Sequence, residues 1–313
     1  MADVIPTRRE IFYKIVRKLI SPRDMIRFMG FKAVTGDEYL YFDFIDLFPW
    51  MHKLMNKLPG NRLDTESPVF LAGLRRSGTT VFYRVMNANK HLFMFNERFP
   101  GDRLNGRSVA SQMNLLYSSE YSDPEIFNKF AKNYFSPGLR SSADRWGAKL
   151  ALELAHPDPG SISIEAMKRI LSGFPESKII AITRDPRDFV LSALQRGGHD
   201  VEWWIDEYIS MMDLYSEMLK HHKKSVLHVK YEDLITDAEN TVKKCCVFAG
   251  IEFDPDMLDP SKWSVKGPRE YESKAISAKL EKWRQAKGVE QGYVRKTTDA
   301  CFPMATEFGY EVD

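Results

Sequence analysis

Short apolar runs alternate with helical patterns along the chain from Pro68 onward. The apolar runs cover residues 69–74, 146–151, 178–183 and 226–230. Runs this short, rich in branched residues and ending at charged or glycine positions, are typical of buried strands in a parallel sheet. Helical spacing of apolar residues marks much of the remaining sequence, at 78–89, 162–173, 186–196, 201–222 and 238–249. The pattern predicts an α/β fold in which helices flank a central parallel sheet and ligands bind at the carboxyl ends of the strands.

Residues 1–66 show a different pattern. Apolar positions recur at helical spacing between residues 11 and 19 among Arg and Lys, and a second apolar stretch covers 42–58. A basic amphipathic helix of this kind either packs on its own domain or lies on a membrane surface. We expect the packed arrangement, with an N-terminal helical extension over 1–66 and one larger domain over 67–313.

Charge composition limits the kinds of partner. The chain carries 45 Lys and Arg against 43 Asp and Glu, which is a formal net charge of +2. A nucleic-acid partner would call for a strongly basic surface, so none is expected. Any anion site must therefore be local.

Cysteine content and the N-terminus indicate the compartment. Cys245 and Cys246 are adjacent and Cys301 is the third and last cysteine, so neither a disulfide framework nor a CxxC metal site can be built. The N-terminus lacks the apolar region of a signal peptide, and no stretch reaches the roughly 18 apolar residues that span a bilayer. We expect a cytoplasmic protein without a membrane span.

One segment has the pattern of a phosphate loop. Gly73-Leu-Arg-Arg-Ser-Gly-Thr-Thr80 follows a predicted strand and opens a predicted helix, where successive backbone N–H groups can surround a phosphate. A nucleotide triphosphatase loop would read GxxxxGK[ST]. Here Thr79 stands at the lysine position, and the cations Arg75 and Arg76 lie inside the loop. The plain alternative is a strand-to-helix turn with two solvated arginines.

A second candidate anion site follows the predicted strand 178–183. The sequence runs Arg184-Asp-Pro-Arg-Asp-Phe-Val-Leu-Ser192, with Pro186 near a helix start, where its missing N–H costs little. Arg184 at the strand end and Ser192 about two turns later can reach one edge of the sheet, and arginine suits phosphate recognition. The plain alternative is a helix cap with ion pairs between Asp188 and neighbouring arginines.

Together the two segments resemble the sulfotransferase superfamily that uses 3′-phosphoadenosine 5′-phosphosulfate (PAPS). Its 5′-phosphosulfate loop reads like PRSGTT and its 3′-phosphate site like RxPRDxxxS. Both patterns occur here in order, although Leu74 and Arg75 stand where many members have proline. The resemblance implies a phosphate-loop NTPase-like sulfotransferase fold for residues 67–313.

Within the superfamily the chain is most similar to the tyrosylprotein sulfotransferase-like branch. Residues 76–97 match that branch without a gap, and Asn96 replaces an acidic residue. Further similar stretches are Gly147-Ala-Lys149, the VxYEDL strand at Val229 to Leu234, Leu280-Glu-Lys-Trp283 and Phe308-Gly-Tyr310. Residues 1–66 have no counterpart in the branch.

The resemblance implies roles for particular residues. Glu97 falls on the general base, and Lys149 and Arg76 complete the catalytic set. The nucleotide-binding set comprises Arg75, Arg76, Ser77, Gly78, Thr79, Thr80, Arg184, Ser192, Lys274 and Trp283. PAPS is the expected co-substrate and no metal is expected. The acceptor is a hydroxyl or amine of a small molecule, peptide or sugar, and a homodimer is left open.

Alternative functions and alternative bases remain. A phosphate-loop kinase or NTPase would bind ATP with Mg²⁺, but the lysine of its loop is missing. A non-catalytic PAPS-binding protein would not need Glu97 or Lys149. His91 and His199 are the rival candidates for the base, although a histidine alone is more often structural.

Overall fold

The computed structural model describes residues 64–95, 145–156, 164, 167–168, 171, 174–263 and 280–312. The predicted extension over 1–66 lies outside these residues except for its last three, which belong to the first strand of the sheet. Glu97 and Lys274 also lie outside the described residues.

A parallel sheet forms the centre of the fold. Its five described strands are β1 (Asp64–Leu74), β2 (Leu92–Phe95), β3 (Arg145–Leu152), β4 (Lys178–Thr183) and β5 (Val226–Lys230). Their order across the sheet is β2-β3-β1-β4-β5, and each of these neighbours pairs in parallel. The predicted α/β class with a central parallel sheet is confirmed.

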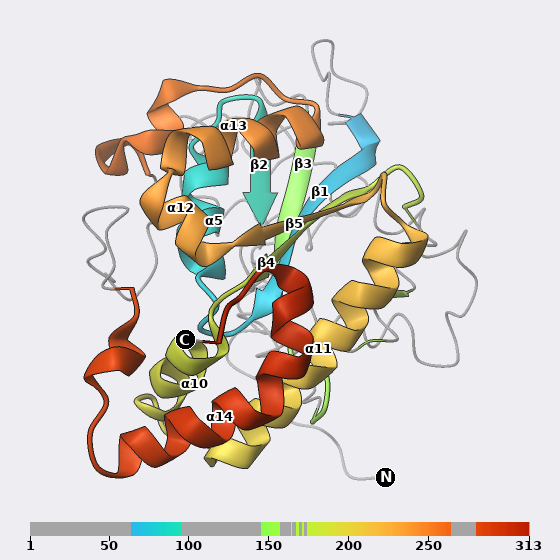
Figure 1. The fold of residues 1–313 in the computed structure, drawn as a ribbon. Coiled ribbons are helices and arrows are strands. Elements are labelled where there is room, and N and C mark those ends of the chain that lie inside the picture. Colours follow the sequence, from blue (N-terminus) through green and yellow to red (C-terminus); the bar gives the residue numbers. More distant parts are fainter. Residues whose placement is uncertain are drawn as a thin grey trace, which may run out of the picture.

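Helices cover both faces of the sheet (Figure 1). One face carries α5 (Thr79–Asn87), α12 (Tyr231–Thr236) and α13 (Ala238–Ala249). The other face carries α10 (Pro186–Leu194), α11 (Val201–His221) and α14 (Val289–Ala305). Short 3₁₀ turns occupy Pro255–Leu258, Pro260–Lys262, Lys282–Gln285 and Thr306–Phe308.

Alternation along the strands explains the two layers of core. In β1, Val69 and Leu71 pack with α5 and α13, whereas Phe70 and Ala72 face α10, α11 and α14. Successive side chains of a strand point to opposite faces, and both faces of this strand are apolar because both are covered. Phe70 and Trp146 meet edge-to-face there, with ring centroids 5.8 Å apart.

Most predicted elements are found, and three were missed. The predicted bounds are correct for β4, β5 and α13. The bounds of β3, α5, α10 and α11 differ from prediction by at most two residues. β1 ends as predicted but begins five residues earlier. Sequence analysis did not find β2, α12 or α14. The expectation that Val229 to Leu234 is one strand was wrong, because β5 ends at Lys230 and Tyr231 begins a helix.

The topology places two loops next to each other. After β1 the chain enters α5 on one face, and after the neighbouring β4 it enters α10 on the opposite face. In open parallel sheets, ligands bind at the carboxyl ends of strands where the connections diverge in this way. Both candidate anion segments lie at this point.

Candidate functional site

The first anion loop (residues 73–80) is a tight turn between β1 and α5. Arg76 and Gly78 both adopt positive φ, of 80° and 93°. The buried Ser77 hydroxyl donates to the carbonyl of Leu74 at 2.7 Å and closes the turn. In the described part of the chain, the backbone amides of Gly78, Thr79 and Thr80 donate no hydrogen bond. Unpaired amides at the start of a helix form an anion-binding site.

Glycine is required at Gly78 for space as well as for conformation. A Cβ there would lie 2.1 Å from Cδ2 of the Tyr231 ring, which belongs to the first turn of α12. Gly73 is also confined, since a Cβ would lie 2.7 Å from Cγ2 of Thr79. The loop is therefore packed closely between its own helix and α12.

The second anion motif (residues 184–192) contacts the first loop directly. The guanidinium of Arg76 donates to the Ser192 hydroxyl from Nη2 at 3.1 Å and from Nε at 3.3 Å. Arg184 donates from Nη1 to the backbone carbonyl of Arg76 at 3.3 Å. Segments more than 100 residues apart thus form one surface that carries two arginines and a helix N-terminus.

Arg184 is buried beside this surface and is not fully satisfied. Its guanidinium lies 3.5 Å from Asp188 and stacks on the Tyr231 ring at 5.0 Å from the centroid. Its Nε has no hydrogen-bond partner among the described residues. A buried guanidinium N–H without an acceptor is costly. The site therefore has capacity for one more acceptor oxygen, as a phosphate would supply.

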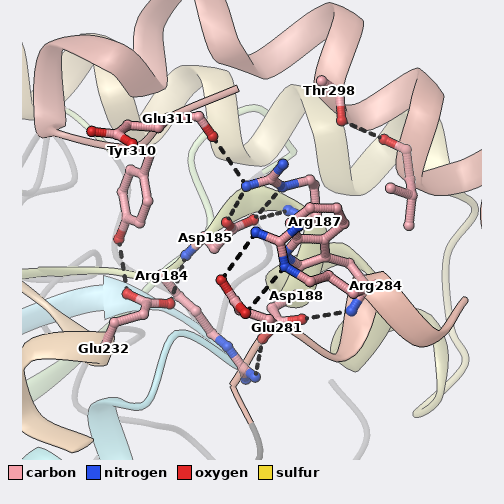
Figure 2. Close-up of polar contacts among 12 residues, drawn as sticks. Arg184, Asp185, Arg187, Asp188, Glu232, Glu281, Arg284, Thr298, Tyr310 and Glu311 are labelled. Atoms are coloured by element: carbon pink, nitrogen blue, oxygen red, sulfur yellow. Dashed lines mark hydrogen bonds and ion pairs between the residues drawn. The ribbon is translucent and has the colours of Figure 1, made fainter. Parts of the chain in front are cut away.

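The helix-cap contacts that sequence analysis offered as the plain alternative are also present (Figure 2). The Asp185 carboxylate accepts from the Arg187 amide at 2.8 Å, and Arg184 pairs with Asp188 across one turn. Burial raises the pKa of Asp188 above its ordinary range, and the charge of Arg184 lowers it. Capping and anion binding are compatible, because they use different atoms of the same turn.

Polar side chains behind the motif hold its backbone in place. Glu232 accepts from the Asp185 amide at 2.9 Å and from the Tyr310 hydroxyl at 3.2 Å (Figure 2). The Thr183 hydroxyl lies 2.8 Å from both the Tyr310 hydroxyl and His228 Nε2. Burial raises the pKa of Glu232 and lowers the pKa of His228 to about 4. A continuous row of hydrogen bonds thus runs from the His228 ring through Thr183, Tyr310 and Glu232 to the Asp185 amide.

Trp283 lies against the same motif. Its amide donates to Asp188 at 3.1 Å, and Arg187 stacks on its ring at 3.7 Å from the centroid. Arg187 also makes a bidentate contact with Asp185, at 3.0 Å from Nε and 2.7 Å from Nη2. The Trp283 indole N–H has no acceptor among the described residues. The structure thus brings Trp283 to the first turn of α10.

Lys149 approaches the first loop from β3. Its ammonium donates to the Thr80 hydroxyl at 3.1 Å, and the residue is 3% exposed. Arg75 pairs with the buried Glu153 just beyond the end of β3, at 3.1 Å. The loop itself has Thr79 at the position where a nucleotide triphosphatase loop has lysine. Lys149 of the neighbouring strand β3 instead brings an ammonium group to the start of α5.

The two rival histidines lie in different places. His91 precedes β2, and Leu92 pairs with Arg145 at the start of β3, so His91 is at the amino ends of the strands, away from the anion loops. His199 stacks on Trp203 at 3.9 Å just before α11. The geometry removes His91 as a candidate base.

Sequence analysis missed residues that act through buried contacts. Glu153, Tyr231 and Glu232 touch the anion segments, and Tyr310 donates to Glu232. Tyr231 to Leu234 and Phe308 to Tyr310 did stand out through the family resemblance, but no role followed from it. Among the described residues there is no cluster of three or more His, Cys, Asp or Glu able to hold a metal ion. No described helix is long and apolar enough to cross a membrane.

Fold and site together define an α/β protein with a candidate anion site at a strand-to-helix loop. Comparison of the sequence with protein families gives a more specific result. Residues 68–255 match the sulfotransferase family, and the chain belongs to this family. The match is to the family as a whole and does not single out the tyrosylprotein sulfotransferase-like branch.

Several solved structures have a similar fold. The sulfotransferase domain from the curacin biosynthetic pathway is 15% identical, with a TM-score of 0.48 over 79% of this chain and 99% of that one. A sulfotransferase of Mycobacterium tuberculosis H37Rv is 12% identical, with a TM-score of 0.46 over 95% and 98%. A mouse sulfotransferase complexed with 3′-phosphoadenosine 5′-phosphate (PAP) is 15% identical, with a TM-score of 0.44 over 75% of this chain and 84% of that one. No curated protein sequence matches the chain significantly.

Proposed function

We propose that the protein transfers a sulfuryl group from PAPS to a hydroxyl or amine of an acceptor molecule. The observation that carries the proposal is the direct contact between the two anion segments, Arg76 to Ser192 and Arg184 to Arg76. PAPS has two separate anionic groups on one nucleotide. A surface built from two loops with separate cationic donors suits such a ligand better than it suits a single phosphate.

The first loop would hold the 5′-phosphosulfate. The unpaired amides of Gly78, Thr79 and Thr80 lie at the positive end of α5 and favour negative charge. Arg75, Arg76 and the side chains of Ser77 to Thr80 complete the proposed set. The strained backbone at Arg76 supports this role, since positive φ in a non-glycine residue is often retained at functional sites.

The second motif would hold the 3′-phosphate. Arg184 has a buried Nε without a partner among the described residues, and both Arg184 and the Ser192 hydroxyl contact Arg76. Trp283 packs on the first turn of α10, where it can contact the nucleotide. Lys274 is proposed from the resemblance alone. Because Mg²⁺ is not needed to bridge these groups, we propose that binding requires no metal.

Catalysis would rest on preorganised charge and a base. In an in-line transfer, the acceptor oxygen or nitrogen forms a bond to sulfur while the bond between sulfur and the bridging oxygen breaks. Charge grows on the leaving phosphate, and the ammonium of Lys149 near Thr80 together with Arg76 would stabilise it. Glu97 would take the acceptor's proton. The products are the sulfated acceptor and 3′-phosphoadenosine 5′-phosphate (PAP).

Transfer from labelled PAPS tests the reaction. The purified protein is incubated with ³⁵S-labelled PAPS and a panel of alcohols, phenols, sugars, amines and peptides, in the presence of a chelator. We expect label to move to at least one acceptor class, with release of an equal amount of PAP. Release of PAP with sulfate but no labelled acceptor would contradict transfer, and absence of PAPS binding would overturn the proposal altogether.

Glu97 is tested by separating binding from turnover. Glu97→Gln keeps the size of the side chain but removes the base, so kcat should fall by about 10²- to 10⁴-fold while the dissociation constant for PAP stays the same. Near-normal turnover would return Glu97 to the role of a solvated carboxylate. Loss of PAP binding would indicate a structural role instead.

A further inference from the structure

Helix α11 touches three neighbouring strands of the sheet through three buried polar side chains. Glu207, Tyr208 and Tyr215 are each fully buried in its interior-facing side. Their partners are backbone atoms inside β1 and in the segments that follow β3 and β4, and these three strands lie side by side. They are also the three strands that carry the candidate site.

Glu207 acts on the chain after β3. Its carboxylate accepts from the Leu154 amide at 2.6 Å and from the His156 amide at 2.7 Å. A buried carboxylate is stable only when its oxygens are hydrogen-bonded, and here two amides do this. The turn that Glu207 holds begins directly after Glu153, the partner of Arg75.

Tyr208 acts on the chain after β4. Its hydroxyl donates to the backbone carbonyl of Arg184 at 2.9 Å. Burial raises the pKa of Tyr208 well above the usual value of a phenol, so the hydroxyl stays protonated and remains a donor. Arg184 is the first residue beyond the last residue of β4, so the sheet does not hold its carbonyl.

Tyr215 makes a chemically matched contact in a different setting. Its hydroxyl donates to the carbonyl of Ala72 at 2.7 Å. Ala72 lies inside β1 and pairs with Leu150 on one side and with Ala181 on the other. The sheet already determines the position of this backbone, so the Tyr215 hydroxyl adds stability without deciding where a site residue lies.

We infer that Glu207 and Tyr208 are positioning residues, which set the backbone of the two strand ends that carry Glu153 and Arg184. The inference rests on the proposed function for its link to PAPS. Glu207 and Tyr208, which are adjacent in α11, would thereby determine how far Glu153, the partner of Arg75 in the first loop, lies from Arg184 in the 3′-phosphate site. This explains why two polar residues are fully buried in a helix whose other inward residues are mainly apolar.

A comparison of Tyr208→Phe with Tyr215→Phe tests the inference. Both changes delete one buried hydroxyl that donates to a backbone carbonyl, so both should lower the midpoint of thermal unfolding by a similar amount. Only Tyr208→Phe should weaken PAP binding, by about 2- to 10-fold, the range for one hydrogen bond. Its affinity for AMP should change less, because AMP lacks the 3′-phosphate. A merely structural loss would weaken PAP and AMP alike.

Hydrogen exchange provides a readout that does not depend on any nucleotide. Peptides covering residues 183–189 should exchange faster in Tyr208→Phe than in the wild type, and peptides covering 153–157 should exchange faster in Glu207→Gln. Tyr215→Phe should leave both regions unchanged. If the wild type fails to bind PAP, the proposed function falls and the exchange data still decide the positioning. Equal exchange and equal PAP affinity in the two tyrosine variants would overturn the inference.

Discussion

The two anion segments are built in opposite ways although they touch each other. The first loop relies on backbone geometry, with positive φ at Arg76 and Gly78 and unpaired amides at the start of α5. The second motif relies on a side chain, the buried guanidinium of Arg184. Tyr208 donates to the backbone carbonyl of Arg184, and Glu232 accepts from the amide of the next residue, Asp185. A backbone site fails when its glycines change. A side-chain site fails when the residues that support it change.

The largest expected effect is that of Gly78→Ala. The new Cβ would lie 2.1 Å from the Tyr231 ring at a φ of 93°, so both collision and left-handed strain apply. We expect a loss of more than about 3 kcal/mol in unfolding free energy and loss of measurable PAP binding. Chemical denaturation and calorimetry measure the two effects.

Gly198→Ala is the matched control for this change. Its φ of 107° imposes comparable strain, but a Cβ there meets nothing within 4 Å. We expect a loss of only about 1–2 kcal/mol and unchanged PAP affinity. Equal effects at the two glycines would mean that contact with Tyr231 does not matter.

Acid sensitivity should be traceable to the support of the second motif. Burial lowers the pKa of His228 from its ordinary 6.5 to about 4. Between these values the unfolded chain binds a proton that the folded chain does not, so unfolding free energy falls as pH drops from 6.5 to 4, by at most about 3 kcal/mol. In His228→Gln this loss should be absent, apart from contributions of carboxylates that both proteins share.

Urea unfolding of both proteins at pH 7 and at pH 4.5 measures the difference. The exposed His221 supplies the control, since His221→Gln should keep the pH dependence of the wild type. An unchanged pH dependence in His228→Gln would show that the imidazole is not buried in solution.

Arg184→Ala should weaken PAP binding without removing it. Charged hydrogen bonds contribute about 1.5–3 kcal/mol, which corresponds to about 10- to 150-fold in the dissociation constant. The exposed Arg295 on α14 is the control, because Arg295→Ala makes the same change at a surface position outside both motifs. Unchanged affinity in Arg184→Ala would leave this residue as part of a helix cap only.

Ser192→Ala should have the smallest effect. It removes one uncharged hydroxyl, which accepts from both Nε and Nη2 of Arg76, and we expect a loss of about 0.5–1.5 kcal/mol, or about 2- to 10-fold in PAP affinity. Titration calorimetry with PAP compares the dissociation constant of this variant with that of Arg184→Ala. An effect larger than that of Arg184→Ala would reverse the assignment of the main 3′-phosphate ligand.

Four of the five described strands could be predicted because they are short apolar runs that lie largely in the core, whereas β2 was missed. β4 and β5 are short, wholly delimited by charged residues or turns, and their predicted bounds are correct. α14 was missed because it contains Gly292 and Pro303, which are unusual inside a helix. The start of α12 was taken for strand because the family resemblance described Val229 to Leu234 as one strand, although the apolar pattern itself ended at residue 230.

The candidate site could be predicted only in part. The residues of the two loops were visible because their spacing has a chemical meaning in sequence. The contacts of Glu207 and Tyr208 were not visible, because their partners are backbone atoms that carry no sequence signal. The hydrogen bond between Arg76 and Ser192 forms because β1 and β4 are neighbours in the sheet. No local sequence pattern predicts this strand order.

Competition between nucleotides tests the central claim that both segments bind one ligand with two anionic groups. Titration calorimetry compares PAP, AMP and ATP with Mg²⁺, the first two in the presence of a chelator. The account predicts that PAP binds without metal and at least about 10-fold more tightly than AMP, because Arg184 recognises the 3′-phosphate. Equal affinity for PAP and AMP, or preference for ATP with Mg²⁺, would contradict it.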